Sequence, residues 1–277
     1  MTASVFIQTL NEEDNLPRCL ASLTWSDDIV ILDSISSDRT QEIVKAAGAR
    51  FYQRKYDGRA NNQNWAVENI DFKHAWVWYV DADEVTTPEL ANEMNSVTSD
   101  ESRPEVAYFV RRRNMFMGKW LKHGGFYDVW IPRLWRPERI RWKRGANPVA
   151  IINGPTGYLR NDFVHYLFSK GLAEWFEKHN RYSSYEAAET VKELDHGSID
   201  WKALMCGDPV GRRIALKHLS FRVPARPVAK FVYSYLLRMG FLDGRAGFTY
   251  CALQSVYEYM ICCKVKELRR REKGLPV

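Results

Sequence analysis

Short apolar runs alternate with amphipathic segments over the first hundred residues. Four runs have the length and β-branched content of buried strands, and we expect them at 3–9, 28–33, 49–53 and 75–80. Helices are predicted between them, at about 14–23, from Asp38 to Gly48, and at about 61–69. Strands that alternate with helices predict an α/β fold with a parallel sheet.

Polar side chains follow three of these predicted strands. Thr9 to Glu12 follow the first, Asp33 ends the second, and Asp81-Ala82-Asp83 follows the fourth. Parallel sheets bind ligands beyond the carboxyl ends of their strands. We therefore expect these residues to share one crevice.

The pattern changes after residue 100. Shorter segments rich in Trp, Tyr and Arg occupy about 105–142, and the chain is mostly helical from about residue 175. A length of 277 residues suits one large domain with an appendage. We expect an α/β domain over 1–195 and a helical, basic and aromatic region over 196–277.

The cysteines and the apolar runs restrict the compartment. The five cysteines are irregularly spaced and lack the paired spacing of zinc or redox motifs. The start of the chain does not have the pattern of a signal peptide, and apolar runs fall short of the roughly 18 residues that a membrane span needs. These features predict a cytoplasmic, reduced protein.

The positive charge is concentrated near the C-terminus. Residues 211–277 contain fourteen Lys and Arg against four Asp and Glu, although the whole chain carries a net charge of only +6. Aromatic and aliphatic runs at 231–237 and 257–263 lie between these cations, a mixture typical of helices on an anionic membrane surface. The alternative is a helical cap whose basic face is solvated. Nucleic-acid binding would explain the charge but not the acidic crevice, so we expect no nucleic-acid partner.

Three acidic residues, Asp81, Asp83 and Glu84, end the most apolar strand. Their mutual repulsion needs an offset, and a divalent cation such as Mg²⁺ or Mn²⁺ is the simplest one. The alternative is that Asp83 or Glu84 caps the helix predicted to begin near Thr87.

The motifs together resemble a known family. They are Thr9-Leu10-Asn11-Glu12-Glu13, then Ile29-Val30-Ile31-Leu32-Asp33-Ser34 with Ser37-Asp38-Arg39-Thr40, and Asp81-Ala82-Asp83-Glu84. Their order and spacing are similar to those of family 2 glycosyltransferases with the GT-A fold, a Rossmann-like, mostly parallel sheet flanked by helices. The Asn-rich stretch 58–64 and Arg112-Arg113-Asn114 resemble the branch that builds lipopolysaccharide cores and exopolysaccharides.

The resemblance implies a role for each strand-end residue. It places Thr9, Asn11 and Glu12 around the nucleoside, Asp33 at the base or ribose, and Arg59, Gln63 and Asn64 near the diphosphate. It places Asp81 at the ribose or the metal, Ala82 in the substrate-binding site and Asp83 at the metal, with His165 as a possible third ligand. For each of these residues a structural role, such as a turn, a cap or a packed histidine, stays open.

Family 2 enzymes invert the anomeric centre and need a base for the acceptor hydroxyl. The resemblance aligns the His and Glu of a Val-His-Glu segment with Asn147 and Pro148, neither of which is a base. The nearest well-placed carboxylate is Asp128, after Gly124 and Gly125, and a turn-forming role is the alternative. Asp162 and Glu174 are poorer candidates. Trp120, Trp130 and Trp135 are expected either to stack on sugars or to fill the core.

The predicted function is thus an inverting, metal-dependent hexosyltransferase. Its donor would be a nucleotide-diphosphate sugar and its acceptor a glycolipid, a polyprenyl-diphosphate-linked glycan or a lipopolysaccharide. It would work at the cytoplasmic face of the inner membrane as a peripheral or monotopic protein. The alternative is a catalytically weak or silent nucleotide-sugar-binding partner in a polysaccharide assembly complex.

Overall fold

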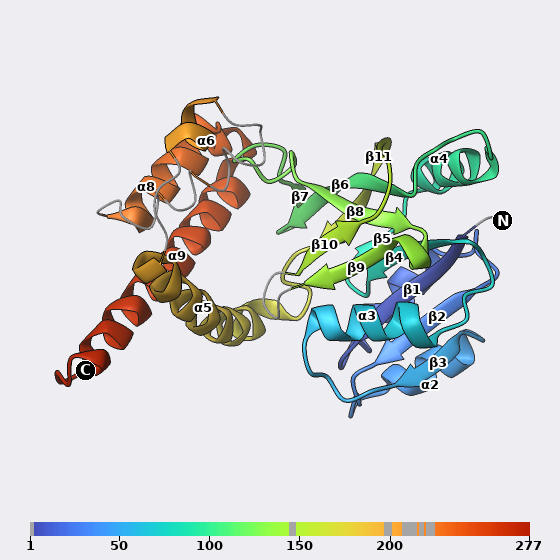
Figure 1. Cartoon of the computed structure of the whole chain (residues 1–277), viewed down its shortest axis with the longest axis horizontal. Helices are drawn as coiled ribbons and strands as arrows, with labels where there is room; N and C mark the ends of the chain where they lie inside the picture. Colours follow the sequence, from blue (N-terminus) through green and yellow to red (C-terminus); the bar gives the residue numbers. More distant parts are fainter. Residues whose placement is uncertain (1–2, 144–147, 197–200, 207–214, 216–218, 220–224) are drawn as a thin grey trace. The chain divides into compact units, whose positions relative to one another are not determined.

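The computed structural model describes residues 3–143, 148–196, 201–206, 215, 219 and 225–277. The chain forms two compact units, Met1–Lys170 and Gly171–Val277 (Figure 1). The division precedes the predicted boundary after residue 195, because helix α5 (Gly171–His196) packs against helix α9 (Gly244–Glu272) within the second unit.

The described part of the first unit contains a nine-stranded sheet in the order β3-β2-β1-β4-β8-β6-β11-β5, with β7 paired to β6. Its first half is parallel and consists of β1 (Ala3–Thr9), β2 (Ile29–Asp33), β3 (Arg50–Gln53) and β4 (Trp76–Asp81). Its second half is mixed and consists of β5 (Glu84–Val85), β6 (Ala107–Phe116), β7 (Lys119–Trp120), β8 (Trp130–Trp135) and β11 (Thr156–Tyr166). Strand β8 runs antiparallel to both of its neighbours and joins the two halves.

Helices cover both faces of the sheet. One face packs against α1 (Leu16–Ala21), α2 (Thr40–Ala46) and α4 (Pro88–Ser99). The other face packs against α3 (Arg59–Asn69) and the antiparallel pair β9 (Ile140–Lys143) and β10 (Val149–Ile152), which follows a 3₁₀ turn at Pro137–Arg139. The four strands predicted for the parallel half of the sheet are confirmed, and each end lies within one residue of its predicted position.

Local sequence determines where several elements begin and end. Gly48 ends α2 with a φ of 67°, a left-handed conformation that glycine adopts at little cost. Helix α4 is capped by Thr87, whose hydroxyl accepts a hydrogen bond from the backbone N–H of Leu90. Neither Asp83 nor Glu84 therefore caps this helix.

The second unit is helical. Its described elements are α5, α6 (Trp201–Cys206), α8 (Arg226–Val232), a π-helical turn η2 (Tyr233–Leu237), a 3₁₀ turn η3 (Gly240–Asp243) and α9. Within the described ranges, none of the helices combines the length and apolar character that crossing a bilayer requires.

Candidate donor and metal site

The ends of β1 and β2 are tied together by Asp33. Its carboxylate is fully buried and accepts hydrogen bonds from the Thr9 hydroxyl at 2.9 Å and from the backbone N–H and hydroxyl of Ser36 at 2.8 and 2.5 Å. Gln53 adds a fourth at 3.3 Å. Thr9 and Asp33 thus hold the ends of β1 and β2 together, and their role toward the nucleoside stays a prediction.

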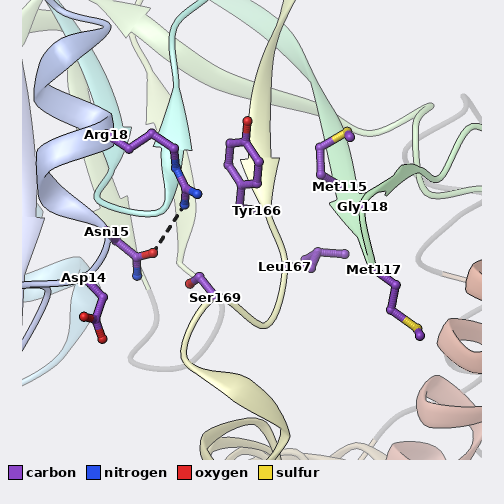
Figure 2. Close-up of a pocket in the computed structure, with 9 residues that line it drawn as sticks. All are labelled: Asp14, Asn15, Arg18, Met115, Met117, Gly118, Tyr166, Leu167 and Ser169. Carbon is purple, nitrogen blue, oxygen red and sulfur yellow. Dashed lines mark hydrogen bonds between the residues drawn. The ribbon is translucent and has the colours of Figure 1, made fainter.

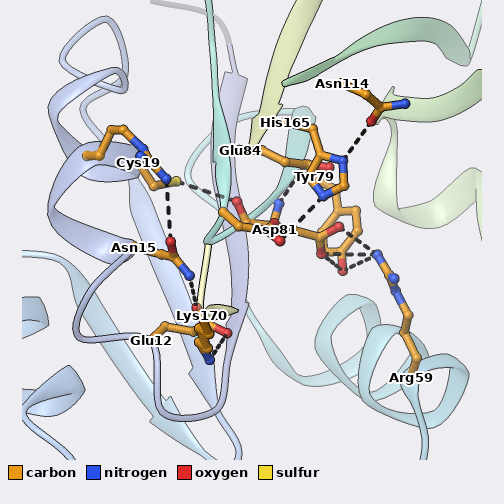
Figure 3. Close-up of polar contacts among 12 residues, drawn as sticks. Glu12, Asn15, Cys19, Arg59, Tyr79, Asp81, Glu84, Asn114, His165 and Lys170 are labelled. Atoms are coloured by element: carbon orange, nitrogen blue, oxygen red, sulfur yellow. Dashed lines mark hydrogen bonds and ion pairs between the residues drawn. The ribbon is translucent and has the colours of Figure 1, made fainter. Parts of the chain in front are cut away.

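The loop after β1 is held against the loop after β2. Asn11 has a φ of 55°, and its side-chain oxygen accepts a hydrogen bond from the backbone N–H of Ser37 at 2.8 Å. Glu12 is bound by Asn15 at 2.8 Å and by Lys170 at 2.7 Å (Figure 3). Burial raises the pKa of Glu12 above its ordinary value, although both partners oppose this.

Asp81 lies between two guanidinium groups. Arg59 donates to both carboxylate oxygens at 3.0 and 2.9 Å, and the Tyr79 hydroxyl adds a bond of 2.8 Å (Figure 3). Arg133 donates to one of the same oxygens at 2.9 Å. Burial alone would raise the pKa of Asp81, but the two arginines lower it far below its ordinary value. The structure therefore pairs Asp81 with cationic side chains.

Arg133 is a site residue that sequence reasoning missed. It is 2% exposed on β8 and also donates to Glu84 at 2.6 Å. Glu84 is equally buried, and its second oxygen accepts the backbone N–H of Asp81 at 2.8 Å. Burial raises the pKa of Glu84 despite the adjacent guanidinium, because a buried carboxylate loses its hydration.

Asp83, Glu84 and His165 form a potential metal site. One ligand atom from each lies within 4.8 Å of the others, and the Nε2 of His165 is 3.4 Å from a carboxylate oxygen of Asp83. The Nδ1 of His165 is 2.9 Å from the side-chain oxygen of Asn114, whose amide nitrogen donates to the carbonyl of Phe126 at 3.0 Å. This bond orients Asn114 as an acceptor, so Nδ1 is the donor and Nε2 is left to bind a cation. Asp81, predicted as a ligand, is not part of this group; Glu84 takes its place.

The other predicted residues are more scattered. Gln63 and Ala82 are buried, and both polar atoms of the Asn64 side chain bond the backbone of Trp142 at 2.8 and 2.9 Å. Asn64 therefore anchors β9 to α3. Asp128 is exposed on the loop before β8. Asn147 lies outside the described residues, and Pro148 precedes β10.

A separate pocket of about 220 Å³ lies beside this site (Figure 2). The start of α1 and the ends of β6 and β11 line it, and the guanidinium of Arg18 stacks on the ring of Tyr166 at 3.7 Å. None of the residues predicted to bind donor or metal lines this pocket.

The model of Glycosyl transferase family 2 matches residues 4–166, and so more than half of the chain. The chain belongs to this family. The predicted family is thus confirmed, and with it the α/β fold of GT-A type and the helical C-terminal region.

This family 2 glycosyltransferase has full-length relatives. It is 22% identical to an uncharacterised glycosyltransferase of Rickettsia prowazekii over 98% of this chain and 89% of the relative. It is 26% identical to the lipopolysaccharide core biosynthesis glycosyltransferase LpsC of Rhizobium meliloti over 95% of this chain and 91% of the relative.

Similar solved structures are more distant. TarS of S. aureus, residues 1–349, matches with a TM-score of 0.45 and 13% identity over 94% of this chain and 91% of that one. A Mycobacterium tuberculosis glucosyl-3-phosphoglycerate synthase in complex with Mn²⁺ and uridine diphosphate matches with a TM-score of 0.37 and 17% identity over 50% of this chain and 57% of that one. At this distance no site residue is transferred from them.

Proposed function

We propose that this glycosyltransferase is an inverting, metal-dependent hexosyltransferase that moves a sugar from a nucleotide-diphosphate donor to a lipopolysaccharide or lipid-linked acceptor. The observation that carries the proposal is the potential metal site of Asp83, Glu84 and His165 beside the ion pair of Asp81 and the buried Arg133.

The side chains of the potential metal site suit Mg²⁺ or Mn²⁺. Carboxylate oxygens and one imidazole nitrogen are ligands that Mn²⁺ accepts, and oxygen ligands suit Mg²⁺. Both oxygens of Glu84 are already bonded to Arg133 and to the backbone of Asp81, so Asp83 and His165 are the principal ligands. A bound divalent cation would neutralise the diphosphate as it leaves.

The unpaired atoms of Arg133 are a second observation, separate from the potential metal site, that favours an anionic ligand. The Nε and Nη1 atoms of this arginine are buried without a hydrogen-bond partner among the described residues. Buried donors rarely stay unpaired, and phosphate oxygens would satisfy them. Arg59 and Arg133 would thus face the diphosphate while Asp81 holds both guanidinium groups in place.

On the acceptor side we retain Asp128 as the proposed base. The loop that contains it is tied to the potential metal site, because Asn114 bonds both the carbonyl of Phe126 and His165. The proposed lipopolysaccharide acceptor is supported by the likeness to the core biosynthesis enzyme of Rhizobium meliloti.

Metal-dependent release of nucleoside diphosphate from a panel of nucleotide sugars tests the proposal. We expect Asp83→Ala to lose this release and Asp71→Ala, an exposed carboxylate on the loop before β4, to retain it. Unchanged release in Asp83→Ala would refute the metal role. A donor that binds but is not consumed with any acceptor extract would favour the silent binding partner instead.

We also propose that the second unit contacts an anionic membrane. Turns η2 and η3 expose an apolar tip of four side chains, with exposed fractions of 52% for Leu236, 71% for Leu237, 50% for Met239 and 52% for Leu242. Exposed contiguous apolar groups of this kind typically mark an interaction surface. The exposed Arg245 and the partly buried Lys230 supply cations beside the tip, and the nearby Asp243 is buried.

The apolar tip has a rigid support. A Cβ on Gly247 of α9 would lie 2.1 Å from the backbone oxygen of Gly240, so two glycines allow η3 to pack directly on the helix. The ring of Tyr235 packs against Phe248 at 5.6 Å and Phe241 at 6.2 Å. Leu236 and Leu237 stay exposed beside this ring cluster and would be available to lipid.

Co-sedimentation with vesicles tests the membrane contact. We expect binding to phosphatidylglycerol vesicles, weaker binding to phosphatidylcholine, and loss of binding in Leu236→Glu/Leu237→Glu. Ile151→Glu, which changes an exposed apolar side chain of the first unit, is the matched control. Equal sedimentation of the double variant and the wild type would rule out the apolar tip as the contact.

A further inference from the structure

One face of the second half of the sheet combines arginine with aromatic rings. We call it the aromatic–arginine face and define it by Arg111, Arg113, Trp120, Tyr127, Trp130 and Tyr158. Strands β6, β7, β8 and β11 and the loop before β8 contribute these residues. The donor and metal site uses none of them.

The register places these side chains together. Arg111 on β6 pairs with Trp130 on β8 and with Asp162 on β11, and directly paired residues project to the same side of a sheet. Strand β11 is irregular between Tyr158 and Asp162. Tyr158 pairs directly with Phe109, two residues before Arg111, so it projects to the same side of the sheet. The Phe109 and Tyr158 rings stack at 5.4 Å, and Trp130 meets Tyr158 edge-on at 5.0 Å.

The face opens on the side of the sheet from which Arg59 reaches Asp81. Ala107 of β6 belongs to the same buried cluster as Tyr79 and Ala60 of α3. Alternation along β6 puts Arg111 on that side, and Arg133 lies three residues from Trp130 along β8, or about 10 Å. A glycan on the aromatic–arginine face would therefore reach toward the donor crevice.

Arg111 is the group that defines the ligand. Its guanidinium lies over the rings of Tyr127 at 4.7 Å and Trp130 at 4.9 Å, and it has no carboxylate partner within the described chain. Arg113 is paired with Asp162 at 2.7 Å, and Asp162 also accepts a bond from Tyr127 at 2.8 Å. Charged groups on or beside the face are the cations Arg111, Arg113, Lys122 and Arg160 and the anions Asp128 and Asp162. The cations are therefore in excess.

The exposed rings define the rest of the ligand. Trp130 is 38% and Tyr158 61% exposed, and flat apolar rings complement the C–H faces of pyranose sugars. We propose that the aromatic–arginine face binds an anionic sugar unit of the acceptor glycan, with its phosphate on Arg111 and its ring on Trp130 and Tyr158. This inference rests on the proposed transfer to a glycan acceptor and specifies the acceptor as acidic.

The test uses the full-length chain and a matched pair of probes. These are deacylated lipopolysaccharide oligosaccharide from a Gram-negative bacterium, either phosphorylated or dephosphorylated with hydrofluoric acid, immobilised for binding measurements. We expect the wild type to prefer the phosphorylated form by about tenfold, as for one charge-assisted contact. Arg111→Gln should lose that preference, and Trp130→Ala should weaken binding of both forms.

Two controls separate this inference from folding and from the donor site. Arg181→Gln removes an exposed arginine of α5 and should leave the preference intact. Thermal stabilisation by nucleoside diphosphate with Mn²⁺ should persist in Arg111→Gln, which also shows that the variant is folded. Equal binding of the two probes by the wild type, or a retained preference in Arg111→Gln, would overturn the inference while leaving donor binding untouched. Binding of the phosphorylated probe without any response to nucleoside diphosphate would support the face and overturn the proposed donor chemistry.

Discussion

The orientation of His165 by Asn114 leads to a sharp prediction. Asn114 is 1% exposed and bridges the Nδ1 of His165 and the carbonyl of Phe126. Asn114→Ala removes both of these hydrogen bonds and should lower the free energy of unfolding by about 1–3 kcal/mol. Without its acceptor the imidazole loses its fixed tautomer and orientation, and loss of such a partner typically costs about 10–100-fold in metal affinity.

The matched control is Asn64→Ala. Asn64 also makes two hydrogen bonds, both to the backbone of Trp142, so its loss should lower stability by a similar amount. We expect Mn²⁺ affinity, measured by electron paramagnetic resonance without nucleotide, to fall in Asn114→Ala and to stay unchanged in Asn64→Ala. If the two variants bind Mn²⁺ equally well, His165 is not a metal ligand held by Asn114.

Three further predictions concern stability. Arg133→Met leaves the buried Glu84 carboxylate without its cationic partner and should lower the free energy of unfolding by about 3–5 kcal/mol in urea titrations at neutral pH; a smaller loss than for an exposed arginine would contradict the buried pairing. Burial alone would raise the pKa of Asp28, but hydrogen bonds from Ser4, the Lys73 backbone and Arg50 lower it overall. The ionised Asp28 therefore stabilises the fold above the unfolded pKa of about 3.9, and this stabilisation is lost as the pH falls below that value. Asp28→Asn should make the free energy of unfolding less dependent on pH in this acidic range. Gly247→Ala should destabilise the second unit by about 1–3 kcal/mol in thermal melts, and an unchanged melting temperature would argue against the close packing of η3.

The first four strands were predictable because their apolar runs are short, rich in β-branched residues and followed by polar turns. The predicted strand 3–9 coincides with β1. The second half of the sheet was harder, because strands far apart in sequence pair there, such as β6 with β11. Local patterns do not encode such pairings.

The candidate site was predicted in part. The strand-end carboxylates and His165 were recognisable as motifs. Glu84, and not Asp81, lies with Asp83 and His165, and the position of the Arg133 guanidinium beside both carboxylates cannot be predicted from motifs. Arg133 had one usable signal: it is a lone charge within the otherwise apolar strand β8, where a buried partner is required. The sequence does not indicate that Asn64 anchors β9, because its hydrogen-bond partner is a backbone group.

The pairing of Asp81 has a consequence for the order in which ligands arrive. Three carboxylates, Asp81, Asp83 and Glu84, lie beside two guanidinium groups, those of Arg59 and Arg133, so these five groups together carry a net charge of −1. A divalent cation alone changes this net charge only from −1 to +1, whereas a diphosphate alone makes it much more negative. We therefore expect the cation to enter first and the diphosphate to follow, each making the other's binding stronger.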